Sequence, residues 1–236
     1  MITKKDLLYN FIFRASSYKK IRTYYHLLEP LFHAMSENNM YLNLGYHFTK
    51  NPLPDSVVKT QENMVDIVTK SFTKNGNWLD VGCGTGAPAC YLAKLNNKIS
   101  IDGINIVESQ IIKAKNLAEL KSLDKKVRFS ICDAKNISSL NRKFENIYAI
   151  ESAFHFDDKQ MFIRNAFDAL ENNGQIAIAD IIIKPELLSF LDFYKVTIAK
   201  HGLATKEFYT IKKWEESLNE AGFRDITSED ITINVA

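Results

Sequence analysis

The chain has 236 residues, of which 46% are hydrophobic and 25% are charged, so it can form one large folded domain and is not a disordered chain. Its 30 basic and 28 acidic residues leave a formal charge of +2, a balance that gives no indication of nucleic-acid binding. The three cysteines have neither the spacing of a disulfide framework nor that of metal ligands, so we expect reduced thiols, no bound metal and a cytoplasmic protein.

The first 54 residues are predicted to form a helical lid that precedes the main domain at 55–236. They are rich in aromatic side chains, which are typical of a packed core or of an apolar pocket: Tyr9, Phe11, Phe13, Tyr18, Tyr24, Tyr25, Phe32 and Tyr41. The apolar stretch 7–13 is short and interrupted by Asn10, so it predicts neither a signal peptide nor a membrane span. A basic, aromatic helix in this region would allow contact with a membrane surface.

A regular alternation of helix and strand patterns follows the lid. Helices are expected over 55–72, 87–95, 109–121, 157–171 and 211–221, the last of them ending at Gly222. Strands are expected over 78–81, 99–106, 127–132, 144–151 and 175–183. The fifth strand is a nearly continuous run of Ile and Ala after an Asn173-Gly174 turn, so we expect it to be fully buried. This order predicts an α/β fold with a doubly wound, mostly parallel sheet, and an apolar segment at about 185–205 is expected to complete the lid.

The most informative segment is Trp78-Leu-Asp-Val-Gly-Cys-Gly-Thr-Gly86, where a buried strand runs into three alternating glycines. Such glycines let the backbone approach a ligand at the carboxyl end of a parallel strand. The spacing is G-x-G-x-G, which differs from the G-x-G-x-x-G of dinucleotide sites, and the Gly-Lys-Ser/Thr ending of a phosphate loop is absent. The segment therefore predicts a loop that binds another nucleotide cofactor.

Polar residues also follow the next three predicted strands. Asn105 and Gln110 come after the second strand, where they serve either a cofactor ribose or a turn and a first helical turn. Asp133 follows the third strand, where it is either a cofactor ligand or a helix N-cap. The fourth strand ends in the string Glu151-Ser-Ala-Phe-His155. Because the carboxyl ends of parallel strands lie at one edge of a sheet, we expect these polar residues to meet there.

Together these strings resemble the class I S-adenosylmethionine (SAM) dependent methyltransferases, within the subgroup that modifies natural products, sterol-like compounds and lipids. The resemblance covers about residues 41–234 and implies a Rossmann-like fold with SAM as cofactor. It places the polar end of SAM near Asp80, the ribose near Asn105 and Gln110, and the adenine near Asp133. The cofactor-binding residues that it implies are Tyr46, Asp80, Gly82, Cys83, Gly84, Gly86, Asn105, Ile106, Gln110, Asp133, Ala134 and Glu151.

The resemblance also implies candidate catalytic residues. His155 would take a proton from a substrate hydroxyl or orient it, and its ordinary pKa of about 6.5 suits that role near neutral pH. It could instead pack between its aromatic neighbours. Asp180, at the end of the fifth strand, would orient the substrate or the histidine, or simply cap the strand. Glu151 is expected on the cofactor side, because an anion stabilises the sulfonium.

The function that follows is methyl transfer from SAM to a hydrophobic small molecule, with oxygen, nitrogen and carbon acceptors all open. A rival hypothesis is a protein of the same fold that binds SAM without methyl transfer, as a cyclisation catalyst or as a subunit of a two-chain complex. A lipid-modifying enzyme is a further alternative. Neither nucleic acid nor a membrane span is expected.

The ending 223–236 departs from the family pattern, which continues through a strand, a helix and a final antiparallel strand. Either Glu229-Asp230 is a tight turn between two strands, or the closing strand is missing from this chain. The second interpretation leaves an unpaired edge beside the fifth strand, so it predicts a second polypeptide or a second copy of the chain at that edge.

Overall fold

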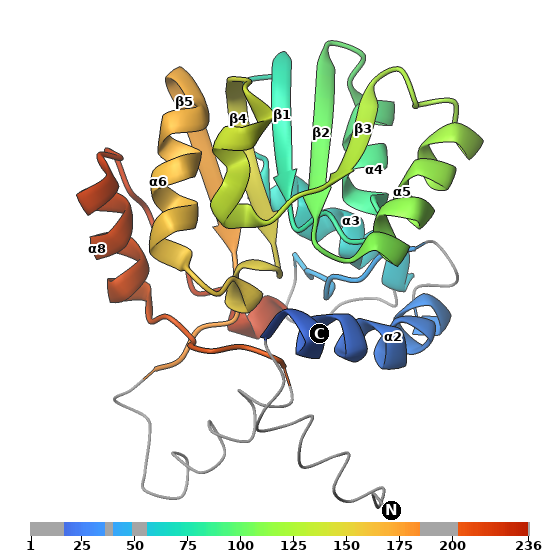
Figure 1. Ribbon diagram of the computed structural model, residues 1–236, viewed down its shortest axis with the longest axis horizontal. Helices are drawn as coiled ribbons and strands as arrows, with labels where there is room; N and C mark the ends of the chain where they lie inside the picture. The colour runs from blue at the N-terminus through green and yellow to red at the C-terminus, as the bar shows by residue number, and fades with distance from the viewer. Residues whose placement is uncertain (1–16, 36–39, 49–55, 185–202, 236) are drawn as a thin grey trace, which may run out of the picture.

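A sheet of five parallel strands lies at the centre of the computed structural model, which describes residues 17–35, 40–48, 56–184 and 203–235 (Figure 1). The strand order in these residues is β3-β2-β1-β4-β5. The strands are β1 Gly76–Val81, β2 Ile99–Asn105, β3 Val127–Ile131, β4 Phe144–Ile150 and β5 Leu170–Ala179. Every neighbouring pair is parallel, so the carboxyl ends of the strands share one edge, as the sequence predicts.

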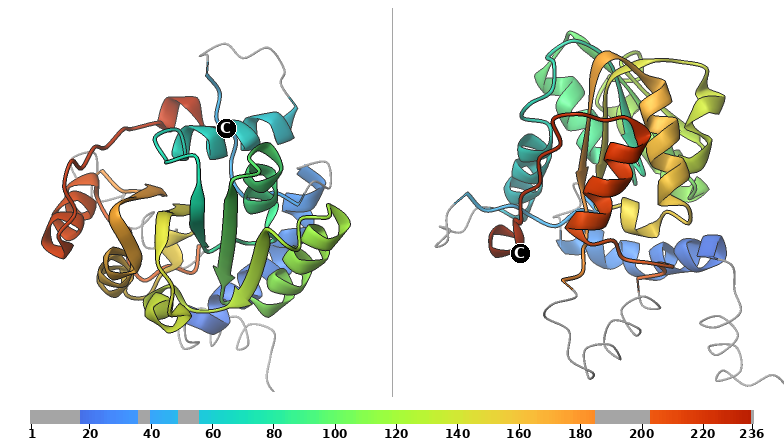
Figure 2. Two further views of the ribbon diagram at one scale, coloured as in Figure 1. Left: turned by 90° about the horizontal axis from the view of Figure 1, so that it is seen from above. Right: turned by 90° about the vertical axis from the view of Figure 1, so that its left-hand side faces the viewer.

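Side chains of β1 alternate between two apolar cores, one on each face of the sheet. Trp78 packs into the core under the helices α3 (Val57–Val68), α4 (Ala87–Leu95) and α5 (Glu108–Leu120). Leu79 and Val81 pack into the other core, under α6 (Lys159–Ala169), α8 (Ile211–Ala221) and the 3-10 helix η1 (Ala134–Leu140). Figure 2 shows the two helical layers on opposite sides of the sheet. Each fully buried Leu or Val contributes about 1.5 to 3 kcal/mol, so both layers stabilise β1 and the loop that follows it.

Local signals set the ends of the helices. α8 covers the predicted residues, because Gly222 takes the left-handed φ of 110° that stops it. α4 also has its predicted bounds. α6 is shorter than the predicted 157–171, since the Asp158 side chain accepts from the amide of Met161 and so caps the helix. The predicted helix over 55–72 runs only from Val57 to Val68, after an N-cap at Ser56.

The prediction that the fifth strand is fully buried was wrong. β5 begins at Leu170, passes through Asn173 with a φ of 63°, and resumes regular pairing with β4 at Gln175. Residues 175–179 are only partly buried. Because β5 is the outermost strand of the sheet in the described residues, it lacks the second neighbour that would bury it. Its sequence is as apolar as that of a central strand, but composition alone does not fix a strand's place in the sheet.

The N-terminal segments cover the carboxyl ends of the strands. α2 (Ser17–Met35) runs across that edge of the sheet (Figure 1). Segment 40–48 is held against α3, where Gln61 donates to the carbonyl of Asn43 at 2.7 Å and Tyr46 donates through its amide to the carbonyl of Thr60 at 2.8 Å. Within the predicted lid, residues 1–16, 36–39, 49–54 and 185–202 fall outside the described residues.

Residues 223–235 do not form the tight hairpin that was one of the two alternatives. They contain the 3-10 helix η4 (Thr232–Asn234) and one isolated antiparallel bridge between Val235 and Tyr46. Ile231 and Val235 pack on the core beneath α3. The tail therefore crosses a face of the sheet and adds no strand to its edge in this part of the chain.

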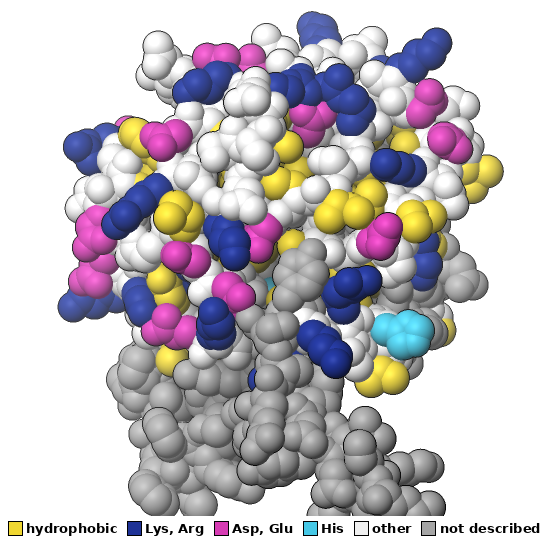
Figure 3. Space-filling model, in the orientation of Figure 1, with side chains coloured by type: hydrophobic (Ala, Val, Ile, Leu, Met, Phe, Trp, Pro, Cys, Tyr) yellow, Lys and Arg dark blue, Asp and Glu magenta, His cyan; other side chains and the backbone are white. Residues whose placement is uncertain are grey.

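The surface carries both charge signs. Figure 3 shows Lys and Arg side chains interspersed with Asp and Glu over the face in view. Among the described residues, no helix is long and apolar enough to cross a membrane, and no three His, Cys, Asp or Glu side chains are grouped as metal ligands.

Candidate functional site

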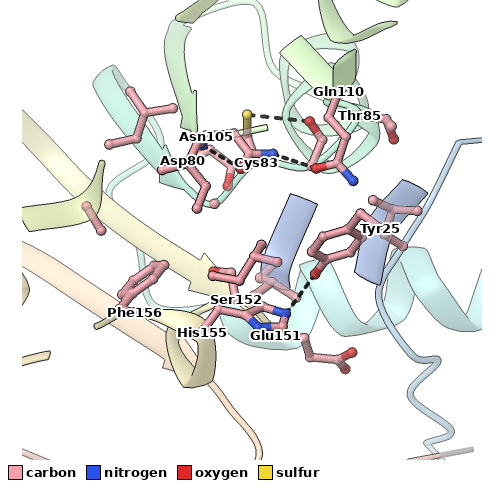
Figure 4. Close-up of a pocket in the computed structure, with 18 of the residues that line it drawn as sticks. Tyr25, Asp80, Cys83, Thr85, Asn105, Gln110, Glu151, Ser152, His155 and Phe156 are labelled. Atoms are coloured by element: carbon pink, nitrogen blue, oxygen red, sulfur yellow. Dashed lines mark hydrogen bonds between the residues drawn. The ribbon is translucent and has the colours of Figure 1, made fainter. Parts of the chain in front are cut away.

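A pocket opens at the carboxyl ends of the strands, between the sheet and α2. Its empty space, including the open mouth, is about 950 Å³. The lining comes from the loops after β1, β2, β3 and β4, from α2 and from residues 40–43. In Figure 4 one group, around Asp80, Asn105 and Gln110, faces a second group around Glu151 and His155 across this space. Strand ends that are far apart in the sequence therefore meet, as predicted.

The three glycines after β1 allow the loop to pack tightly on both sides. A Cβ at Gly82 would lie 2.4 Å from the Cβ of Ser152, and one at Gly86 would lie 2.5 Å from the ring of Phe129. Gly84 has more room, because a Cβ there would meet only Leu42, at 3.0 Å, and its φ of 53°, like the positive φ of the other two, disfavours any other residue. Gly84 thus presents bare backbone to the pocket, while Gly82 and Gly86 let the loop pack against Ser152 after β4 and against Phe129 of β3.

Asp80 lies at the base of the pocket with only 3% of its surface exposed. Burial raises its pKa to about 7, and the neighbouring Tyr148 lowers it by a smaller amount. Its Oδ2 has no hydrogen-bond partner among the described residues. Since buried polar atoms are nearly always paired, this oxygen fits a ligand that brings a hydrogen-bond donor or a positive charge.

Asn105 and Gln110 form one unit at the end of β2. The Asn105 side chain donates to Oε1 of Gln110 at 2.6 Å and accepts from the amide of Ile106 at 2.8 Å. Gln110 is 1% exposed, and its Nε2 is buried without a partner in the described part of the chain. All three residues line the pocket, where Gln110 provides a donor for a ligand.

Asp133 has the N-cap role, one of the two alternatives that the sequence left open, and its cofactor role stays a prediction. It caps η1 by accepting from the amide of Lys135 at 3.1 Å, and its side chain pairs with Lys135 Nζ at 3.4 Å. It also lines the pocket together with Cys132 and Ala134. Cys83, from the glycine loop, also lines the pocket.

Glu151 joins the sheet to the N-terminal segment. It has a left-handed φ of 48°, a strained conformation for a residue other than glycine. Its Oε2 accepts from the amide of Leu44 at 2.9 Å. Burial raises the pKa of Glu151 to about 7, while this hydrogen bond lowers it by less. Glu151 lines the pocket and provides a second carboxyl group there.

His155 lies in the 3-10 turn after β4 and is 6% exposed. Its Nε2 is 3.1 Å from the hydroxyl of Tyr25 on α2. Burial lowers the pKa of His155 to about 3, the backbone of Ala204 partly opposes this, and the charge of Lys159 lowers it further. The imidazole is therefore neutral at physiological pH, and it lines the pocket beside the β1 loop. The expectation of a pKa near 6.5, suited to proton transfer at neutral pH, was wrong because burial disfavours the charged ring.

Asp180 is not among the residues that line the pocket. Its Oδ1 accepts from the amide of Phe154 at 2.8 Å. Lys159, which is 4% exposed, donates to the carbonyls of Phe154 and Phe156 at 3.1 Å each. Burial raises the pKa of Asp180 and lowers that of Lys159, and their mutual attraction opposes both shifts. These two side chains hold the backbone of the turn that carries His155. Asp180 therefore positions the histidine turn and does not line the pocket.

Tyr46 lies in the core, 7% exposed, with its ring 5.2 Å from that of Phe48. It is absent from the pocket lining, where Met40, Leu42 and Asn43 of the same segment appear instead. Tyr46, which the resemblance placed among the cofactor-binding residues, thus lies outside the pocket lining in this structure.

Sequence reasoning missed several residues that line the pocket. Tyr25 was noted only as part of an aromatic region, and its position emerges from packing of α2 on the strand ends. Thr85 is 1% exposed and its hydroxyl donates to the carbonyl of Met40. Ser152 donates to the carbonyl of Val81 at 2.7 Å and so links the ends of β1 and β4. Thr85 lies within the glycine-rich string 78–86 and Ser152 within the string 151–155, so their position in these motifs was the sequence feature that could have identified them.

Comparisons with known proteins agree on one family. A family model described as a methyltransferase domain matches residues 72–222. Methyltransferase GfsG of Streptomyces halstedii is 28% identical over 172 residues, which are 72% of this chain and 60% of that protein, so the chain spans less than two thirds of its length. O-methyltransferase resE of Aspergillus sclerotiorum is 31% identical over 202 residues, 83% of this chain and 73% of that protein. The crystal structure of the [4+2]-cyclase SpnF superimposes with a TM-score of 0.77 at 25% identity, covering 93% of this chain and 78% of that one.

Proposed function

The chain belongs to the family of methyltransferase domains, and on that basis we propose that it transfers a methyl group from SAM to a hydroxyl group of a hydrophobic small molecule. The observation that carries the proposal is the meeting of a glycine loop, two partnerless buried polar atoms and a neutral histidine around one pocket. The relative resE is named an O-methyltransferase, which favours oxygen among the three acceptors.

The pocket residues fit the two ends of SAM. Asp80, with its partnerless Oδ2, would bind the amino group of the methionine part beside the backbone of Gly84. Gln110 Nε2 would donate to a ribose hydroxyl, with Asn105 holding the Gln110 side chain in place. The adenine would lie at Asp133 and the adjoining residues Ile106 and Ala134. Glu151 would face the positive charge.

Bound SAM supplies a methyl group on a positively charged sulfur, which is a good leaving group. The protein therefore has mainly to position and to exclude water. α2 covers one side of the pocket with Ile21 and Tyr25. Leu42, Ile150 and Phe156 add apolar walls. Neutral His155 can orient the acceptor hydroxyl by a hydrogen bond, whereas a pKa of about 3 makes it a weak base for taking the proton. The turn that carries it is held by the Asp180 and Lys159 contacts.

A binding experiment and a product assay test the proposal. Isothermal titration calorimetry should show binding of SAM and of S-adenosylhomocysteine, and Gln110→Leu should weaken both because it removes the partnerless donor. Gln160→Leu is the matched control, since Gln160 pairs with Ser217 at 2.9 Å and lies outside the pocket lining. Equal affinities of the two variants would contradict the assigned site.

A second candidate is a protein that binds SAM without transferring the methyl group. The likeness to the cyclase SpnF over 93% of the chain favours it. Mass spectrometry of the product distinguishes the two, because a cyclisation leaves the mass of the organic substrate unchanged and methylation adds one methyl group.

The partner hypotheses remain proposals. The half-buried outer strand β5 supports pairing with a second polypeptide or a second copy of the chain. Light scattering tests the second copy, since a monomer at high concentration would contradict it. The predicted peripheral contact with a membrane and a lipid acceptor are tested by sedimentation with anionic liposomes. A cytoplasmic location and the division into a lid at 1–54 and a main domain at 55–236 are likewise proposed.

A further inference from the structure

Residues 40–44, which we call the strap, run past the pocket from the glycine loop to the end of β4. At one end of the strap, the Thr85 hydroxyl donates to the carbonyl of Met40. At the other end, the amide of Leu44 donates to Oε2 of Glu151 at 2.9 Å. Figure 4 shows Thr85 beside Gln110 and Glu151 beside His155, in the two groups that face each other across the pocket. The strap thus links the two sides of the pocket, and it adds to the lining Met40, Leu42 and Asn43.

The backbone around Glu151 is held by the strands on both sides of β4. The Glu151 amide donates to the carbonyl of Ala179 on β5 at 2.8 Å, and the hydroxyl of Ser152 donates to the carbonyl of Val81 on β1 at 2.7 Å. These contacts keep Glu151 at a φ of 48°. A residue other than glycine keeps such a conformation only where its surroundings impose it, and strain of this kind concentrates at functional sites. Glycine would adopt the conformation without strain, so the Glu151 side chain has to supply something that glycine lacks.

The hydrogen bond from Leu44 is not needed to attach the strap to the rest of the fold. Asn43 Nδ2 donates to the carbonyls of Leu44 and Gln61 at 2.9 and 3.2 Å, and Gln61 Nε2 donates to the carbonyl of Asn43 at 2.7 Å. Gln61 lies on α3, outside the pocket lining. Without Glu151 the strap would stay attached to α3 and lose its contact with the turn after β4. That contact is charge-assisted and so roughly twice as strong as a bond between neutral groups.

The position of the strap sets the shape of the pocket at the glycine loop. A Cβ at Gly84 would lie 3.0 Å from Cδ1 of Leu42, so Leu42 packs beside the bare backbone of this loop. We propose that Glu151 is a positioning residue for methyl transfer, which fixes the strap so that Leu42 stays at the glycine loop and helps to exclude water. The inference rests on the proposed function, in which SAM binds at this loop. Excluding water strengthens the electrostatic contacts inside such a pocket.

Hydrogen exchange of the Leu44 amide measures the contact without any methyl transfer. Glu151→Ala should speed this exchange by about 10-fold or more, the effect of losing a hydrogen bond to a charged group. Glu151→Gln keeps an oxygen that accepts from the amide and should stay within about threefold of wild type. Glu145→Ala is the matched control, because Glu145 accepts from the amide of Asn77 at the other end of β4, outside the pocket lining. Unchanged exchange in Glu151→Ala overturns the proposal.

A second variant separates the loss of the contact from a failure to fold. Glu151→Gly removes the same carboxyl group and also relieves the strain, because glycine readily adopts a φ of 48°. Its melting temperature should therefore exceed that of Glu151→Ala, while its Leu44 amide exchanges as fast as in Glu151→Ala. Wild-type exchange of Leu44 in this folded variant would contradict the positioning role.

Calorimetry with S-adenosylhomocysteine, whose sulfur is neutral, separates positioning from a direct effect of the Glu151 charge on the sulfonium. Glu151→Ala should weaken its binding by about 10-fold, and Glu151→Gln should stay within about threefold of wild type. Weakening confined to SAM, and equal in the two variants, would assign Glu151 a charge effect alone and overturn the proposal. If the wild-type protein binds neither ligand, the proposed function fails, whereas equal binding of S-adenosylhomocysteine by all variants defeats only the present inference.

Discussion

Binding of SAM should tighten as the pH rises from 6 to 7, because the pocket holds carboxyl groups that ionise in this range. Burial raises the pKa of Asp80 to about 7, so the carboxylate fraction grows from about one tenth at pH 6 to one half at pH 7. If the positively charged amino group of SAM binds only the carboxylate form, the Kd should fall about fivefold, equivalent to about 1 kcal/mol. Glu151, whose pKa is also raised to about 7, acts in the same direction.

The same pKa shift has a defined sign for stability. In the absence of ligand, the raised pKa means that folded Asp80 keeps a proton that the unfolded chain has lost. Its contribution to stability is therefore fully present below the unfolded value of 3.8 and is lost as the pH rises through about 7. Thermal unfolding of Asp80→Asn should lack this part of the pH dependence.

Calorimetry in two buffers of different ionisation enthalpy checks the binding prediction. At pH 6, SAM binding should release protons, and Asp80→Asn should both weaken binding at pH 7 and reduce the pH dependence that remains. Glu151→Gln serves as a comparison for the second carboxyl group. A Kd that is constant between pH 6 and 7, or one that falls as the pH is lowered, would refute the assignment of Asp80 to the cationic end of SAM.

Variants at three further positions probe the glycine loop and the turn that carries His155. Gly84→Val should abolish SAM binding while the melting temperature shows that the fold persists, because Gly84 needs a φ of 53° and presents bare backbone to the pocket; wild-type affinity would exclude the site. Lys159→Met should lower the free energy of unfolding by about 3 kcal/mol in chemical denaturation, because it leaves the buried charge of Asp180 unbalanced and removes two hydrogen bonds to the turn. A change below about 1 kcal/mol would contradict a role of Lys159 in holding the turn. Asp180→Asn keeps an oxygen for the Phe154 amide and should retain much more activity than Asp180→Ala, whereas equal losses would indicate direct participation of the charge in the reaction.

Short-range patterns in the sequence were sufficient to predict the parallel sheet and the meeting of the motif residues at one pocket. The glycine loop and the polar residues after β2, β3 and β4 are contiguous with their strands, and parallel strands bring their carboxyl ends to one edge. The predicted strand bounds also agree with the structure to within one residue at β2 and β4.

Features that depend on distant contacts were not predictable in the same way. The Tyr25–His155 contact joins positions 130 residues apart and requires the docking of α2. The turn that carries His155 is held by Lys159, whose sequence position indicates only an ordinary helix residue and whose burial is seen only in the structure. The edge position of β5 reflects the absence of a further neighbour in the described residues, which its own apolar composition does not encode.

Methyl transfer is tested most directly by mass spectrometry of products formed with SAM that carries a deuterated methyl group, using a panel of hydrophobic alcohols and phenols. We expect a product heavier than its acceptor by one labelled methyl group, formed together with S-adenosylhomocysteine and lost in Gly84→Val. An organic product with the mass of its substrate, or SAM bound and never consumed with any acceptor, would contradict it.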